Sequence, residues 1–171
     1  MPRYLYLLRH AQSAEKQRSQ SDKQRELTPL GIRQSLQVAN FFLNEKSFPD
    51  IIVCSVAERA LATASLIADA LKFEPERVSA QEELYEASTR TLLEFISQLD
   101  NTLLHVLCVA HNPAISYLAE YVTKSEIGEM SPAGMAIIQF DIDSWKEVSA
   151  GNGLLLRYID VNNVKSEGDG R

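Results

Sequence analysis

Three apolar, strand-like segments of the sequence are each followed by an arginine, a histidine or both. These residues are Arg9 with His10, Arg59, and His111. Arginine offers a planar fork of N–H donors suited to phosphate oxygens, and a neutral imidazole beside such a clamp is a competent nucleophile toward phosphorus. The residue types therefore predict phosphoryl transfer through a covalent phosphohistidine, which water then breaks down.

Each of these residues also has a simpler interpretation when it is taken alone. Arg9 and His10 could be the first solvated residues after a strand. Arg59 could pair with Glu58 or point into water, and His111 could be a core histidine. Arg59 is the most informative, because a cation in the first turn of a helix opposes the helix dipole unless an anion is shared between them. Three such coincidences at corresponding strand ends are less probable than one phosphate pocket.

The pocket requires a sheet whose strands end on the same side, and the order of predicted elements meets that requirement. Strands alternate with helices, which predicts a three-layer α/β/α sandwich with a mainly parallel central sheet. The carboxyl ends of parallel strands meet at one edge of such a sheet. Strands are predicted over residues 3–9, 51–54, near 78, 103–110, 136–142 and 154–161, and helices over 29–46, from 55, over 89–99 and over 113–123.

Helix starts are marked by local sequence patterns. Thr28-Pro29 supplies a hydroxyl N-cap and a first-turn proline, the segment 55–58 reads as an S-x-x-E capping box, and Asn112-Pro113 repeats the cap-and-proline pattern. The first helix shows apolar residues at helical spacing, namely Ile32, Leu36, Ala39 and Leu43. The polar residues 11–27 before it read as a long loop.

Length and composition indicate one globular domain over residues 1–161 of the 171, with a disordered tail at 162–171. The net charge of −6 argues against nucleic acid as a partner. No apolar run approaches the roughly 20 residues that span a bilayer, and the first strand has the wrong flanks for a signal peptide, so we expect a cytoplasmic protein without a membrane partner. Cys54 and Cys108 read as buried hydrophobic residues, and no zinc-ligand spacing is present. We expect no metal and no cofactor; the oligomeric state is open, with a monomer expected.

At these residues the sequence resembles the histidine phosphatase superfamily of phosphoglycerate-mutase-like enzymes, and within it the short SixA-type phosphohistidine phosphatases. The matching segments, in the family's order, are Leu8–Ser13 (R-H-A type), Leu27–Gly31 (L-T-x-x-G), Ser55–Ala64 (S-x-x-x-R-A-x-x-T-A), Leu84–Ala87 (L-Y-x-A) and His111–Pro113 (H-N-P). The resemblance implies a phosphoglycerate-mutase-like fold and His10 as the nucleophile. It further implies that Arg9, Arg59 and His111 bind the phosphoryl group.

The resemblance also suggests auxiliary residues. Ser13 and Arg25 are candidate phosphate contacts. Larger relatives use a glutamate as general acid, in a segment that Leu84-Tyr85-Glu86 resembles, so Glu86 is the first candidate and Glu83 the second. The alternative is that both are surface charges of an acidic loop.

The substrate prediction depends on the short intervals between motifs, which leave little room for a capping insertion. An open pocket would admit a phosphorylated side chain of another protein, and phosphohistidine releases an imidazole that can be protonated before it leaves. We therefore expect a phosphatase of protein phosphohistidine. The alternatives are a phosphatase of small phosphomonoesters and a catalytically silent phosphate-binding module.

Overall fold

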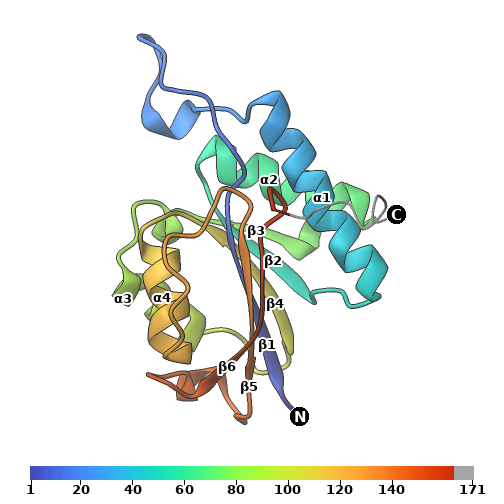
Figure 1. Ribbon diagram of the computed structural model, residues 1–171, viewed down its shortest axis with the longest axis vertical. Helices are drawn as coiled ribbons and strands as arrows, with labels where there is room; N and C mark the ends of the chain where they lie inside the picture. The colour runs from blue at the N-terminus through green and yellow to red at the C-terminus, as the bar shows by residue number, and fades with distance from the viewer. Residues whose placement is uncertain (164–171) are drawn as a thin grey trace, which may run out of the picture.

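A computed structural model describes residues 1–163 and builds six of its segments into one sheet (Figure 1). The strands are β1 (Arg3–Arg9), β2 (Ile51–Ser55), β3 (Val78–Gln81), β4 (His105–Ala110), β5 (Met135–Phe140) and β6 (Gly153–Ile159). Their order is β3-β2-β4-β1-β5-β6; the pairs among β1 to β4 are parallel, and β5 is antiparallel to both of its neighbours. The predicted mainly parallel sheet is thus confirmed.

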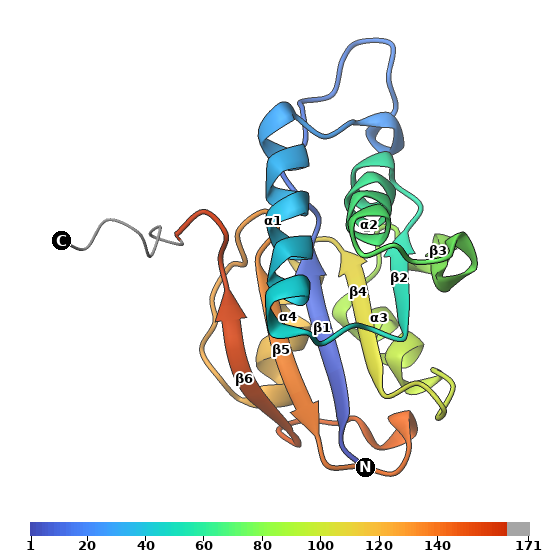
Figure 2. The same cartoon turned by 90° about the vertical axis from the view of Figure 1, so that its right-hand side faces the viewer.

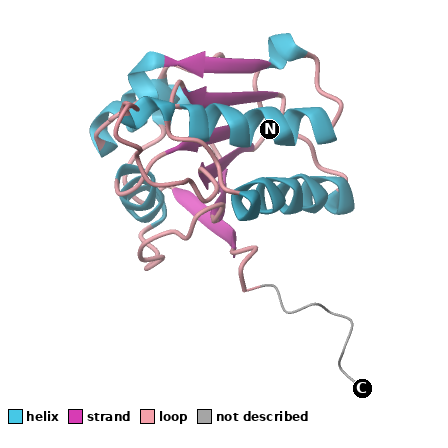
Figure 3. Cartoon of the chain, turned by 90° about the horizontal axis from the view of Figure 1, so that it is seen from above, coloured by secondary structure: helices cyan, strands magenta, loops and turns pink. Residues whose placement is uncertain are grey.

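Four longer helices form the outer layers. They are α1 (Pro29–Glu45), α2 (Glu58–Ala70), α3 (Thr89–Ser97) and α4 (Ala114–Thr123). Helices α1 and α2 cover one face of the sheet, and α3 and α4 cover the other (Figures 1 and 2). Figure 3 distinguishes the helices from the strands by colour. Each face carries its own apolar core, which explains why the central strands are apolar on both sides. Within residues 1–163, no helix is long and apolar enough to cross a membrane.

The predicted tail, residues 162–171, lies outside the described residues from position 164 onward. Its first two residues, Asn162 and Asn163, are both hydrogen-bonded to the Asp160 carboxylate.

The register between β1 and β4 sets the positions that matter for the pocket. Leu8 lies beside Val109 and Arg9 beside Ala110, so both strands end at the same level. The backbone N–H of His10 donates to the carbonyl oxygen of Ala110 at 3.1 Å, which continues the pairing by one residue. Strand β2 joins β4 from the other side, with Cys54 beside Val109.

Two of the three predicted helix caps differ in the structure. Thr28 caps α1 as predicted, accepting a hydrogen bond from the Gly31 N–H. The capping box at residues 55–58 is wrong: Ala57 is the N-cap of α2 and Ser55 still belongs to β2. The Ser55 hydroxyl accepts from the Ala57 N–H and is engaged across the sheet, as described below, because β2 extends one residue further than its apolar run.

Helix α4 also starts one residue later than predicted, with Pro113 at the N-cap after a cis Asn112–Pro113 peptide bond. Asn112 caps no backbone N–H. Its side chain instead accepts from the Ser116 hydroxyl at 2.6 Å and donates to the Met130 carbonyl at 3.0 Å. Tertiary partners therefore take the place of the predicted local cap.

The apolar spacing noted in α1 does not mark the face that packs on the sheet. Ile32, Leu36 and Leu43 are each about 40% exposed, at 42%, 41% and 42%, whereas Ala39 is fully buried. The buried face includes the polar residues Gln34 and Ser35, together with Val38, Ala39 and Phe42. The pattern misleads because these polar side chains are buried with partners: for example, Gln34 Oε1 accepts from the Gln12 N–H at 2.9 Å.

That contact belongs to a group of hydrogen bonds that hold the start of the long loop after β1 against α1. The Gln12 carbonyl accepts from the Thr28 N–H, and the Thr28 hydroxyl donates to the Gln12 side-chain oxygen at 2.7 Å. Further along, the loop projects beyond the carboxyl ends of the strands (Figures 1 and 2) and includes a short 3-10 helix, Asp22–Gln24. Gly31 makes this approach possible, since a Cβ there would lie 2.1 Å from the Gln12 carbonyl oxygen.

Replacing Gly31 with alanine should therefore lower the free energy of unfolding by about 1–3 kcal/mol, because a backbone atom must shift to admit the methyl group. Urea unfolding measures the change. Gln37→Ala, on the exposed side of the same helix, is the control and should be neutral or slightly stabilising. Equal stability of G31A and the wild type would contradict this account of the close approach.

Candidate active site

The ends of β1 and β4, the loop after β1 and the first turn of α2 surround a cavity of about 300 Å³. The residues that line it are Arg9, His10, Gln12, Ser13, Arg25, Arg59, His111, Asn112 and Pro132. The four residues predicted to meet at the strand ends, Arg9, His10, Arg59 and His111, are therefore brought together from segments that are distant in sequence. Ser13 and Arg25 join them.

His10 is held in one orientation by its own backbone. Its Nδ1 lies 2.8 Å from the Ala11 carbonyl oxygen, which can only accept, so Nδ1 carries the proton and the lone pair is on Nε2. The Ala11 N–H in turn donates to the Thr63 hydroxyl of α2 at 3.1 Å, which fixes this turn of the chain. Any nucleophilic attack by this side chain would therefore come from Nε2.

Burial is the main cause of the low basicity of His10. It lowers the pKa of His10 to about 3, and the charges of His111, Arg59 and Arg9 act in the same direction, against the hydrogen bond to Ala11. Desolvation contributes more to this shift than the cationic neighbours do. The imidazole is neutral at pH 7 and its lone pair is available.

His111 faces His10, with ring centroids 5.2 Å apart. Its Nε2 lies 2.7 Å from the Ser55 hydroxyl, and its Nδ1 is buried with no hydrogen-bond partner in the described part of the chain. Burial and then the charge of Arg59 lower the pKa of His111 to about 4. If Ser55 donates to Nε2, the proton of the neutral ring is on Nδ1, where it can be donated to an oxyanion.

Arg9 and Arg59 show the same incomplete pairing. Arg9 donates from Nη1 to the Met130 carbonyl at 2.8 Å, and Arg59 donates from both Nη atoms to Asp22, but the Nε of each is buried without a partner. Within residues 1–163, four buried side-chain nitrogens lack a partner, and three belong to Arg9, Arg59 and His111. Such groups are costly to leave unpaired, and these three residues line one cavity, so the cavity is a candidate site for an oxyanion.

Asp22 is the site residue that the sequence did not reveal. Its Oδ2 accepts from Arg59 Nη2 at 3.1 Å and from the Tyr85 hydroxyl at 2.7 Å, and its Oδ1 accepts from Arg25 Nη1 at 3.1 Å. These hydrogen bonds hold the pKa of Asp22 below its usual range, with the Tyr85 contribution largest. Arg59 is therefore neither solvated nor paired with Glu58, the two simpler interpretations of the sequence.

Arg25 ties this segment to the other predicted contact, Ser13. Its Nη2 donates to the Ser13 hydroxyl and its Nε to the Ala14 carbonyl, both at 2.9 Å. Both residues line the cavity, as expected of auxiliary phosphate contacts. Their role in binding remains a prediction.

The two candidate acids lie elsewhere. Glu86 and Glu83 are exposed, and neither is among the residues that line the cavity. Glu86 follows Tyr85 with a positive φ of 54°, and its carboxylate makes no hydrogen bond with the described residues. Tyr85, whose ring centroid is 5.9 Å from that of His111, is the nearer part of this segment. A role for Glu86 as general acid remains an untested prediction.

Comparison with known proteins agrees with this geometry. The model of the histidine phosphatase superfamily (branch 1) matches residues 5–93, just over half of the chain. The chain belongs to the histidine phosphatase superfamily. An uncharacterised protein of Mycobacterium tuberculosis is 29% identical over 162 residues, which cover 88% of this chain and 98% of that protein.

Solved structures share the fold. The protein histidine phosphatase SixA complexed with tungstate has a TM-score of 0.79 at 24% identity, covering 95% of this chain and 99% of that one. A mycobacterial glucosyl-3-phosphoglycerate phosphatase has a TM-score of 0.63 at 19% identity, covering 91% and 97%. The predicted phosphoglycerate-mutase-like fold of the superfamily is thus confirmed.

The burial of His10 predicts how stability depends on pH. The unfolded chain binds a proton on His10 below about pH 6.5, whereas the folded protein does so only near pH 3, so the free energy of unfolding should decrease as the pH falls from 6.5. At pH 5 this residue should account for a loss on the order of 1–2 kcal/mol. Denaturant unfolding in phosphate-free buffer at pH 7.5 and 5 measures it. H10Q should lose less stability than the wild type over this range, and an equal loss would argue against a buried neutral His10.

Asp22 should hold its segment against the rest of the site. Among the described residues, Asp22 provides the only carboxylate bonded to the buried Arg59, and Asp22→Ala removes it. We therefore expect the segment to open more often and trypsin to cleave after Lys16 or Arg18 about tenfold faster. Mass spectrometry of the fragments measures the rate. E26A removes an exposed carboxylate that makes no side-chain hydrogen bond. It is the control, and equal cleavage of D22A and E26A would contradict the role of Asp22.

Proposed function

We propose that the protein is a phosphatase that forms a covalent phosphohistidine on His10 and acts on phosphohistidine in other proteins. Membership of the histidine phosphatase superfamily supports phosphatase activity. The observation that carries the proposal is that Arg9, Arg59 and His111, each with a buried, unpaired nitrogen, line the same cavity as a neutral His10. An anion-binding module would need the arginines, but it would have no use for an imidazole with a free Nε2 lone pair.

The proposed reaction has two displacements at phosphorus. The Nε2 of His10 forms a bond to phosphorus as the bond from phosphorus to the leaving group breaks, and the Nδ1 proton stays bonded to the Ala11 carbonyl. Water then attacks phosphorus on the opposite side from His10, the bond from Nε2 to phosphorus breaks, and both protons of the water leave with the phosphate as H2PO4−. Nε2 regains its lone pair, so the enzyme returns to its starting state.

Charge balance in the cavity supports a dianionic phosphoryl group. Arg9, Arg25 and Arg59 contribute three positive charges, Asp22 contributes one negative charge within bonding distance, and both histidines are neutral. The two positive charges that remain balance the two negative charges of a phosphoryl dianion. In this proposal the guanidinium groups stabilise the transition-state charge, and catalysis needs no metal.

The leaving group distinguishes phosphohistidine from phosphate esters. An alkoxide needs a proton donor in the transition state, but Glu86 and Glu83 do not line the cavity. A departing imidazole is protonated beforehand near its pKa of about 6.5. Between Arg59 and Leu84 the chain holds only the rest of α2, β3 and short 3-10 turns, so no inserted domain covers the cavity there. Small phosphomonoesters remain the second candidate, because one structural relative is a glucosyl-3-phosphoglycerate phosphatase.

Trapping the intermediate tests the proposal. The protein is mixed with a phosphohistidine-bearing protein, quenched in base and analysed by mass spectrometry, with H10A alongside. We expect base-stable, acid-labile phosphate on His10 that disappears as the donor is consumed. Labelling by a sugar phosphate but not by phosphohistidine would transfer the assignment to small esters. Binding of phosphate without labelling from either donor would leave only a binding module.

A further inference from the structure

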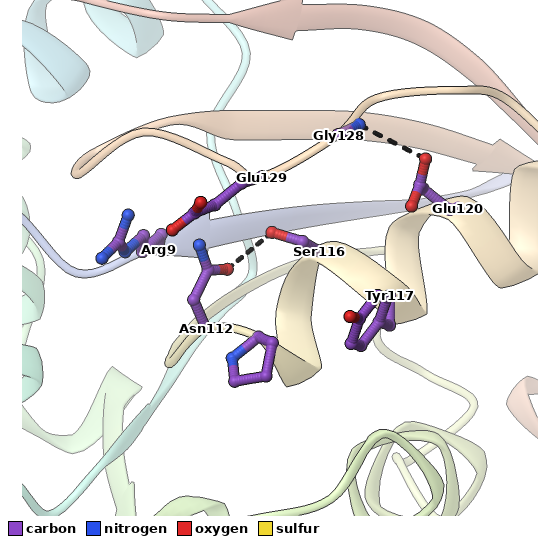
Figure 4. A pocket seen from close by; sticks show the side chains of 8 residues that line it. Arg9, Asn112, Ser116, Tyr117, Glu120, Gly128 and Glu129 are labelled. Atoms are coloured by element: carbon purple, nitrogen blue, oxygen red, sulfur yellow. Dashed lines mark hydrogen bonds between the residues drawn. The ribbon is translucent and has the colours of Figure 1, made fainter.

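A second cavity of about 460 Å³ adjoins the proposed phosphoryl site (Figure 4). Arg9 and Asn112 line both cavities, so a phosphoryl group held by Arg9 lies at the boundary between them. The other residues that line it are Pro113, Ser116, Tyr117, Glu120, Gly128 and Glu129. The part of the substrate that carries the phosphoryl group has to extend out of the first cavity, and the second cavity is the larger space beside it.

The walls of this cavity are held by hydrogen bonds rather than formed by loose surface chains. Ser116 is buried; its hydroxyl donates to Asn112 at 2.6 Å and accepts from the Met130 N–H at 2.9 Å. The Glu120 carboxylate accepts from the N–H groups of Ile127 and Gly128, at 2.9 and 3.3 Å. These contacts fix the segment after α4 against the helix and shape the cavity before any ligand enters.

Two side chains remain free to meet a ligand. The Glu129 carboxylate makes no hydrogen bond or ion pair with the described residues, and Figure 4 shows it extending toward Arg9 and Asn112. Tyr117 is 60% exposed and contributes an aromatic ring to the same cavity. A carboxylate and an aromatic ring together favour a cation, through charge and through the cation–π interaction.

We propose that this cavity binds a lysine or arginine side chain of the phosphorylated protein, one or two residues from the phosphohistidine. The proposal rests on the proposed function and narrows its substrate to phosphohistidine in a basic sequence context. An extended peptide advances about 3.3–3.6 Å per residue, so a flanking side chain reaches a cavity that shares Arg9 with the phosphoryl site. Glu129 would repel a carboxylate at the same place, which disfavours phosphoglycerate-like substrates.

Matched peptides test this specificity. Three peptides carry a non-hydrolysable phosphonate analogue of phosphohistidine and differ only in the flanking residues, which are lysine, glutamine or glutamate. Calorimetry should show tightest binding for the lysine peptide, about fivefold over glutamine, and weakest for the glutamate peptide. In E129Q the lysine preference should disappear, and in E129K the order should reverse. Y117L should reduce the lysine preference without reversing it.

Glu126→Gln is the matched control, because Glu126 is exposed in the same segment but does not line the cavity. It should keep the wild-type order of affinities. A lysine preference that persists in E129Q, or that is lost equally in E126Q, would overturn the proposal, as would tightest binding of the glutamate peptide by the wild type.

The binding measurement is separate from catalysis. Turnover of the corresponding phosphohistidine peptides and labelling of His10 report on the proposed function, whereas the order of affinities reports on the second cavity. Selective binding without turnover would refute the phosphatase and retain the basic-side-chain site. Turnover with affinities that do not depend on the flanking charge would support the phosphatase and refute the basic-side-chain site.

Discussion

Parallel pairing of β1 and β4 is the constraint on which the site depends. Because Arg9 lies beside Ala110, the residues that follow, His10 and His111, emerge at the same level of the sheet. The strands are covered on both faces, so a shift of register would expose apolar residues of two cores at once. The two imidazole rings, whose centroids are 5.2 Å apart, are therefore held in place mostly by the free energy of burying strand side chains.

At the ends of these strands the site contains buried arginines whose hydrogen bonding is incomplete. Arg59 is 6% exposed, and Asp22 is its one carboxylate partner among the described residues. Asp22 compensates part of the positive charge and occupies the Nη atoms, while the Nε of Arg59 has no partner. Unpaired buried donors reduce the stability of the protein and favour an oxyanion ligand for the same reason, because both follow from desolvation.

In the proposed enzyme, the two cavities divide recognition of the substrate between them. The first is lined by arginine and histidine and suits a phosphoryl group of any origin; the second, with Tyr117 and Glu129, lies where the rest of the substrate must pass. Arg9 belongs to both. Burial lowers the pKa of Arg9 and the Glu129 carboxylate partly offsets this, so the charge of the second cavity acts on a residue of the first.

The sequence by itself determined the alternation of strands and helices, the three strand ends and the four residues that meet there. An apolar run that ends abruptly at polar residues can be recognised from the local sequence alone. In a parallel sheet the polar residues at the carboxyl ends of the strands then meet at one edge. Only the tertiary structure decided which face of α1 is buried, because Gln34 and Ser35 find partners there. It also assigned Ser55 to His111 instead of a helix cap, and brought Asp22 to Arg59 across 37 positions. A polar side chain forms hydrogen bonds with the groups that lie near it in the folded protein, and the spacing of residues along the chain does not reveal which groups those are.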